Sequence, residues 1–126
     1  MAHVGSKPDR GQQGPELVVL YDDNHLLGVV KPAGMPTQAG RPGEPCLLDV
    51  ARQWVRERYQ KPGNVFLGLV HRLDRPVAGA MIFARTSKAA SRLSQQIRAR
   101  SVTKIYRALV SGRPAASEGE LVHHVE

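Results

Sequence analysis

The chain has 126 residues, of which 41% are hydrophobic, and it carries a formal net charge of +7 at pH 7. This length fits one modest domain with a single core. The single cysteine, Cys46, excludes an intrachain disulfide framework and a cysteine-based metal cluster, and it fits a reducing compartment. Because no stretch approaches the roughly 20 apolar residues of a membrane span, we expect a soluble, cytoplasmic protein with no membrane partner.

The first half of the chain predicts a strand pair, a long loop and a helix. Residues 1–15 are rich in Gly, Gln, Lys and Pro and predict a flexible leader before one domain at 16–126. Apolar runs at 17–21 and 26–31 flank an Asp-Asp-Asn turn and predict two strands. Pro and Gly between residues 32 and 45 predict a loop, and helical spacing of apolar residues predicts a helix over 47–59.

The second half alternates strands with one helix. Residues 67–73 alternate as a strand does, and residues 80–85 form a second apolar run. A helix is expected over 87–98, with Thr86 or Ser87 as its N-cap, and a strand over 103–110. The fold class is therefore predicted to be α+β, with a mixed, mainly antiparallel sheet and two helices.

The segment HRLDR at residues 71–75 is the strongest candidate for a functional site. If the strand extends through it, Arg72 and Asp74 share one face. A cationic neighbour keeps a carboxylate ionised, and an ionised Asp can act as a nucleophile. A surface salt bridge is the alternative, and the local sequence alone favours it.

The basic residues are segregated. No acid lies between Arg75 and Ser117, whereas nine Lys or Arg residues do. This pattern suits contacts with the phosphates of a nucleic acid, although a solvated basic face with no ligand would look the same. The side chains expected on a nucleic-acid backbone are Arg75, Arg85, Lys88, Arg92, Arg98, Arg100 and Lys104.

Three segments in the same order resemble the RluA-type RNA pseudouridine synthases. They are VVKPAGMPT at residues 29–37, HRLDR at 71–75 followed by Gly79 and the apolar run at 80–84, and KIYRALVSG at 104–112. The resemblance implies that Asp74 is the catalytic aspartate, acting as nucleophile or as base, while Arg72 fills the helix gap left by the flipped base. It also implies that Tyr106 packs against the target uracil; on the sequence alone, a core tyrosine is the better interpretation.

The resemblance implies an isomerisation of uridine that needs no cofactor, in ribosomal or transfer RNA. No metal site is expected, because His71 stands alone and His123–His124 lacks partners at useful spacing. Lys31 and His71 match family positions that look structural.

Two departures from the family pattern matter. Pro76-Val77-Ala78 replaces the usual hydroxyl residues after the aspartate, which puts the hydrogen bonds of that turn in question. The resemblance also covers only about half of the family domain, so we expect little activity from these residues alone and self-association through an incomplete sheet. The alternative function is a truncated, noncatalytic RNA-binding protein.

Overall fold

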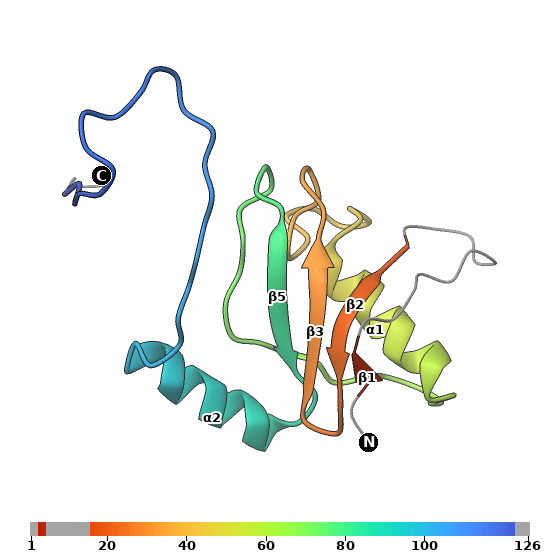
Figure 1. Cartoon of the computed structure of the whole chain (residues 1–126). Helices are drawn as coiled ribbons and strands as arrows, with labels where there is room; N and C mark the ends of the chain where they lie inside the picture. The colour runs from red at the N-terminus through yellow and green to blue at the C-terminus, as the bar shows by residue number, and fades with distance from the viewer. Residues whose placement is uncertain (1–2, 5–15, 123–126) are drawn as a thin grey trace.

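The computed structural model describes residues 3–4 and 16–122 and contains one antiparallel sheet with two helices (Figure 1). The strand order is β1-β2-β3-β5-β4. All four strand pairings are antiparallel, so the predicted α+β class is confirmed, without a parallel pair in the described ranges. The elements are β1 (His3–Val4), β2 (Val18–Asp22), β3 (Leu26–Lys31), α1 (Leu47–Arg58), β4 (Gly68–Leu69), β5 (Gly79–Ala84) and α2 (Ser87–Arg98).

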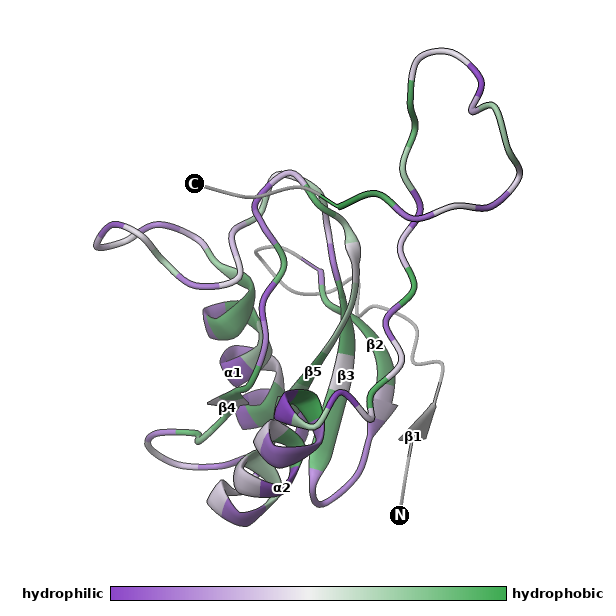
Figure 2. Cartoon of the chain, turned by 90° about the vertical axis from the view of Figure 1, so that its left-hand side faces the viewer, coloured by the Kyte–Doolittle hydropathy of each residue, from purple (hydrophilic) through white to green (hydrophobic). Residues whose placement is uncertain are grey.

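The core lies between α1 and one face of the sheet. Alternate residues of the strands point to this face, as the period of two requires, and Figure 2 shows apolar colour along β3 and β5. Each such side chain that is fully buried stabilises the fold by about 1.5–3 kcal/mol. The strands contribute Val19, Leu27, Val29, Met81 and Phe83, and α1 contributes Leu47, Leu48, Ala51 and Val55.

Helix α2 contacts the edge of the sheet formed by β5 and β4. It begins where predicted, because the Thr86 hydroxyl accepts a hydrogen bond from the Ala89 amide at 3.0 Å. Gly68 permits the close approach: a Cβ at this position would lie 2.9 Å from the Cβ of Ala90. The helix therefore packs against backbone at a point where a side chain would not fit.

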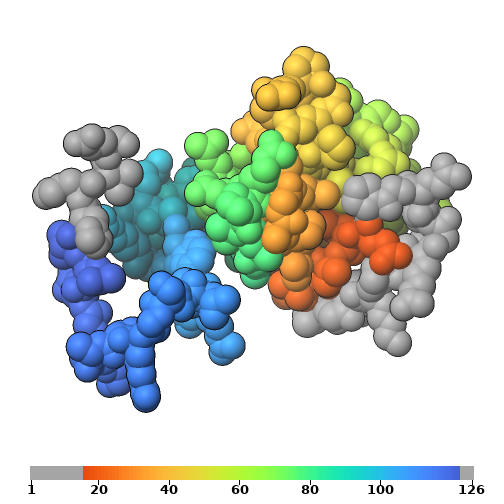
Figure 3. All heavy atoms as spheres, turned by 90° about the horizontal axis from the view of Figure 1, so that it is seen from above, coloured from red at the N-terminus to blue at the C-terminus, as the bar shows by residue number. Residues whose placement is uncertain are grey.

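The strand predicted over 103–110 is wrong, because these residues form neither helix nor strand. A strand needs a hydrogen-bonded neighbour, and within the described chain this segment has none. Its first part, residues 103–107, lines a cavity beside β5, and the chain beyond it projects from the body of the molecule, as the blue spheres show in Figure 3. The strand predicted over 67–73 is also shorter than expected, since only Gly68 and Leu69 pair with β5.

The predicted leader is described at two residues only. His3 and Val4 form β1 and pair with Asp22 and Tyr21 of β2. The rest of the leader, like His123–His124, lies outside the described residues.

Candidate active site

Asp74 lies in a turn between β4 and β5. The carbonyl of Asp74 accepts a hydrogen bond from the Val77 amide at 2.9 Å. This backbone bond closes the turn without the side-chain hydroxyls that the family pattern has, so the replacement by Pro76-Val77-Ala78 leaves the turn closed. The side chains alternate as expected through this stretch: Arg72 and Asp74 are exposed and Leu73 is buried.

Thr37 fixes the backbone immediately before Asp74. Its buried hydroxyl donates a hydrogen bond to the Leu73 carbonyl at 2.7 Å and accepts one from the Leu73 amide at 3.1 Å. One side chain thus satisfies both polar groups of Leu73, as a neighbouring strand would. Because removing it would leave two buried groups unpaired, this contact holds Leu73 in one position.

Lys31 fixes the backbone immediately after Asp74. This lysine is fully buried at the end of β3, and its Nζ donates to the carbonyls of Pro32, Met35 and Arg75 at 3.1, 2.6 and 3.1 Å. The Gly34 amide donates to the same Arg75 carbonyl at 2.7 Å. Residues 31–37 therefore hold the chain on both sides of Asp74.

The charges near Asp74 differ from the expected pattern. Arg75 forms an ion pair with Glu44 instead, and among the described residues no ion pair includes Asp74. Burial and the Arg75 charge lower the pKa of Lys31, whereas Asp74 opposes them. An exposed carboxylate close to a buried ammonium is thus the electrostatic feature of this turn.

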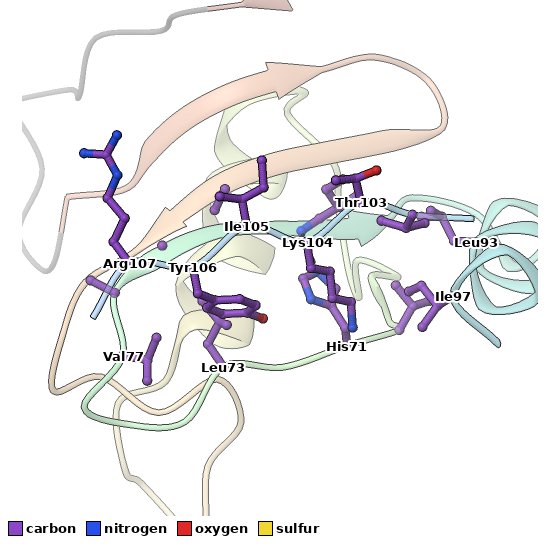
Figure 4. A pocket seen from close by; sticks show the side chains of 16 residues that line it. His71, Leu73, Val77, Leu93, Ile97, Thr103, Lys104, Ile105, Tyr106 and Arg107 are labelled. Atoms are coloured by element: carbon purple, nitrogen blue, oxygen red, sulfur yellow. Dashed lines mark hydrogen bonds between the residues drawn. The ribbon is translucent and has the colours of Figure 1, made fainter. Parts of the chain in front are cut away.

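A cavity of about 360 Å³ lies beside the turn, between β5, α2 and the segment after α2 (Figure 4). His71 lies in its wall, and its Nε2 accepts a hydrogen bond from the Ile82 amide at 3.0 Å, so the ring is neutral there. Burial and the charge of Lys104 lower the pKa of His71. His71 thereby replaces a strand partner at the edge of β5.

Tyr106 lines this cavity and remains 63% exposed. Figure 4 shows its ring turned toward Leu73. It is not a core residue, contrary to the interpretation that the sequence alone favoured. Leu73 and Val77, on either side of Asp74, line the same cavity, whereas Asp74 does not. The structure therefore brings Tyr106 next to the turn without placing both predicted site residues in one pocket.

Most of the basic residues that were expected on a nucleic-acid backbone are exposed. These are Arg75, Lys88, Arg92, Arg98, Arg100 and Lys104. Arg85 is the exception: its Nη1 lies 3.2 Å from the buried Asp22 carboxylate and donates to the Asp23 carbonyl at 2.7 Å. The guanidinium also stacks 4.2 Å from the centre of the Tyr59 ring. Arg85 therefore joins the strands to α1 and is not one of the exposed cations that could contact a nucleic-acid backbone.

Thr37 and Glu44 were not singled out by sequence reasoning. Thr37 lies inside the segment VVKPAGMPT, so the motif included it without indicating a contact with Leu73. Glu44 is the one acid in the Pro- and Gly-rich loop at 32–45, and its pairing with Arg75 depends on how that loop folds.

The described residues contain no group of three His, Cys, Asp or Glu side chains that could hold a metal ion. In the same part of the chain, neither helix has the length and apolar character needed to cross a bilayer.

The family model described as RNA pseudouridylate synthase matches residues 25–126. The chain belongs to this family. It is 38% identical over 103 residues to the ribosomal large subunit pseudouridine synthase D of Pseudomonas aeruginosa, covering 79% of this chain and 31% of that protein. The dual-specificity RNA pseudouridine synthase RluA of Escherichia coli is 36% identical over 107 residues, covering 85% of this chain and 46% of that protein. The predicted membership of the RluA-type pseudouridine synthases is confirmed.

A solved structure supports the same assignment. Human RNA pseudouridylate synthase domain containing 4 is 28% identical with a TM-score of 0.56, covering 66% of this chain and 30% of that one. The chain thus spans less than half the length of these pseudouridine synthases.

Proposed function

We propose that this chain is the part of an RNA pseudouridine synthase that carries the catalytic aspartate, Asp74. In this reaction the N1–C1′ bond of uridine breaks, the uracil turns, and C5 bonds to C1′; C5 then loses its proton to solvent, and N1 takes up a proton. No atom is gained or lost, so no cofactor is required. The supporting observation is the clamp formed by Lys31 and Thr37, which holds the backbone on both sides of an exposed carboxylate. A reacting group needs such fixed surroundings.

The other site residues receive roles in the same proposal. Tyr106 provides an aromatic surface for the uracil of a flipped nucleotide, and Arg72 fills the gap left in the RNA helix. Exposed cations contact the RNA backbone, which positions the substrate without reading its sequence. These cations are Arg75, Lys88, Arg92, Arg98, Arg100 and Lys104.

The substrate class and the cellular setting extend the proposal. The name of the Pseudomonas aeruginosa relative, a ribosomal large subunit synthase, favours ribosomal RNA, and transfer RNA is the other class of substrate that the family resemblance implies. The single cysteine favours a reducing compartment such as the cytoplasm.

Self-association through the sheet also belongs to the proposal. Strand β4 pairs only with Phe83 and Ala84, so in the described chain the outer edge of β5 has no ladder partner from Gly79 to Met81. An unpaired edge invites pairing with another strand. Light scattering of the 126-residue chain should give a mass above that of a monomer. The mass of a monomer would contradict self-association.

The function is tested by mapping pseudouridine with carbodiimide in RNA from a strain that lacks the gene. We expect at least one pseudouridine to disappear, and to return with the intact gene but not with its Asp74→Asn variant. An unchanged map would contradict the synthase function. Unchanged pseudouridines together with RNA binding by the purified protein would favour the noncatalytic RNA-binding alternative.

A further inference from the structure

The loop at 38–45 folds back on itself beside Arg75. Pro42 and Gly43 occupy the two central positions of a turn that the Glu44 amide closes by donating to the Arg41 carbonyl at 3.2 Å. Gly43 has a φ of +77°, which the third position of a type II turn requires. The turn places the Glu44 side chain next to the backbone at Gly40 and next to the guanidinium of Arg75.

The Glu44 carboxylate is held by several hydrogen-bond donors. One oxygen pairs with the Arg75 guanidinium, and the other accepts from the Gly40 amide at 3.2 Å. The bond with Arg75 is the largest cause of a lowered pKa for Glu44, and the amides of Gly40 and Arg41 act in the same direction. Glu44 is therefore a carboxylate in a cradle of backbone N–H groups and a guanidinium.

Such a cradle has the chemistry of a phosphate site. Guanidinium groups and successive backbone amides bind phosphate oxygens in the same way as carboxylate oxygens. Arg41 lines the same open hollow as Glu44 and Arg75 and carries a second positive charge. We propose that this hollow binds a backbone phosphate of the RNA substrate, and that Glu44 occupies it as an internal competitor until the phosphate displaces it. The inference rests on the proposed function.

The contacts permit this exchange. The Arg75 side chain is 57% exposed and the Glu44 side chain is 17% exposed, so water competes for the guanidinium, and an ion pair at a protein surface contributes little. The Arg75 backbone stays in place meanwhile, since its carbonyl is bound by Lys31 and Gly34. Only the side chain has to change partner. Because Arg75 follows Asp74 directly, the bound phosphate would lie close to the nucleotide at the catalytic aspartate.

The exchange is tested by a double-mutant cycle on RNA affinity with the 126-residue chain. The variants are Glu44→Gln, Arg75→Gln and the double variant, and Glu118→Gln, an exposed glutamate outside the loop, is the matched control for lost negative charge. Affinity for a structured RNA is measured over a salt series. We expect Glu44→Gln to bind about two- to five-fold more tightly than the control at low salt, the range that loss of one exposed ion pair allows.

The arginine variants decide the mechanism. Arg75→Gln should reduce the slope of log affinity against log salt by about one contact, and in its background Glu44→Gln should lose its gain. Arg75→Lys, which preserves the charge, should keep most of the slope. A gain that persists without Arg75, or equal effects of Glu44→Gln and Glu118→Gln, would overturn the inference while RNA binding stands. No RNA binding by the unaltered chain would overturn it together with the proposed RNA substrate.

Discussion

The Nζ of Lys31 lies 3.1 Å from the carbonyl oxygen of Arg75, 44 residues further along the chain. This contact joins the end of β3 to the residue after Asp74, and the Thr37 hydroxyl joins the same loop to the residue before it. Two of the three segments that resemble the family are thereby in direct contact. The first segment acts as the support on which the second segment presents its carboxylate.

Replacement of Lys31 by methionine should destabilise the fold. Methionine fills similar space but leaves three carbonyl acceptors without their ammonium donor, and unpaired buried polar groups cost about 1–3 kcal/mol. Urea unfolding of Lys31→Met should show a loss of about this size. Lys61→Met, at an exposed lysine, is the matched control. If both variants unfold at the same urea concentration, the Lys31 contacts contribute nothing to the stability of the fold.

Two substitutions of Thr37 separate the role of its hydroxyl from that of its methyl group. Thr37→Val removes both hydrogen bonds to Leu73 and should cost about 1–3 kcal/mol, whereas Thr37→Ser keeps the hydroxyl and should cost about 1 kcal/mol or less. Hydrogen exchange at the Leu73 amide should accelerate in the valine variant only. Equal stability and equal exchange in the two variants would show that Leu73 is held by other contacts.

The sequence predicted the sheet hairpin and both helices because their signals are local: apolar spacing, turn residues and the Thr86 cap. It failed at residues 103–110, where the pattern of a strand is present but no partner strand lies beside it in the described chain. The clamp on Asp74 and the burial of Arg85 were also not predicted, since both depend on contacts between residues far apart in sequence. The sequence shows the charge of Arg85, but it does not indicate that this charge pairs with Asp22.

His71 should make stability depend on pH. Its pKa is lowered in the folded protein by burial and by Lys104, so the unfolded chain binds a proton more readily. The stabilisation that neutral His71 contributes is therefore complete above about pH 6.5, the pKa of an unperturbed histidine, and it is lost as the pH falls through the lower pKa of His71 in the folded protein. Urea unfolding between pH 8 and pH 5 should show this loss of stability. His71→Gln, which retains an acceptor for the Ile82 amide, should remove the part of the pH dependence that His71 causes. His25→Gln is the control. If it reduces the pH dependence of stability as much as His71→Gln does, the assignment of this dependence to His71 is contradicted.

RNA affinity should fall steeply with salt and depend on α2. Replacing Lys88 and Arg92 together by glutamine removes two exposed cations from this helix, which should lower the slope of log affinity against log salt by about one to two. The paired control is Arg58→Gln with Lys61→Gln at the end of α1. A flat salt response in the unaltered chain would remove this basic face as an RNA site.

The most direct test of the central claim is tritium release from RNA labelled at C5 of uridine, with the full-length product of the gene. Asp74→Asn keeps the size of the side chain and removes its charge, so it should abolish release while RNA affinity stays within about two-fold. Asp49→Asn, at an exposed aspartate on α1, should release tritium at the rate of the unaltered protein. Retained turnover in Asp74→Asn would contradict the account and reduce Asp74 to a structural residue.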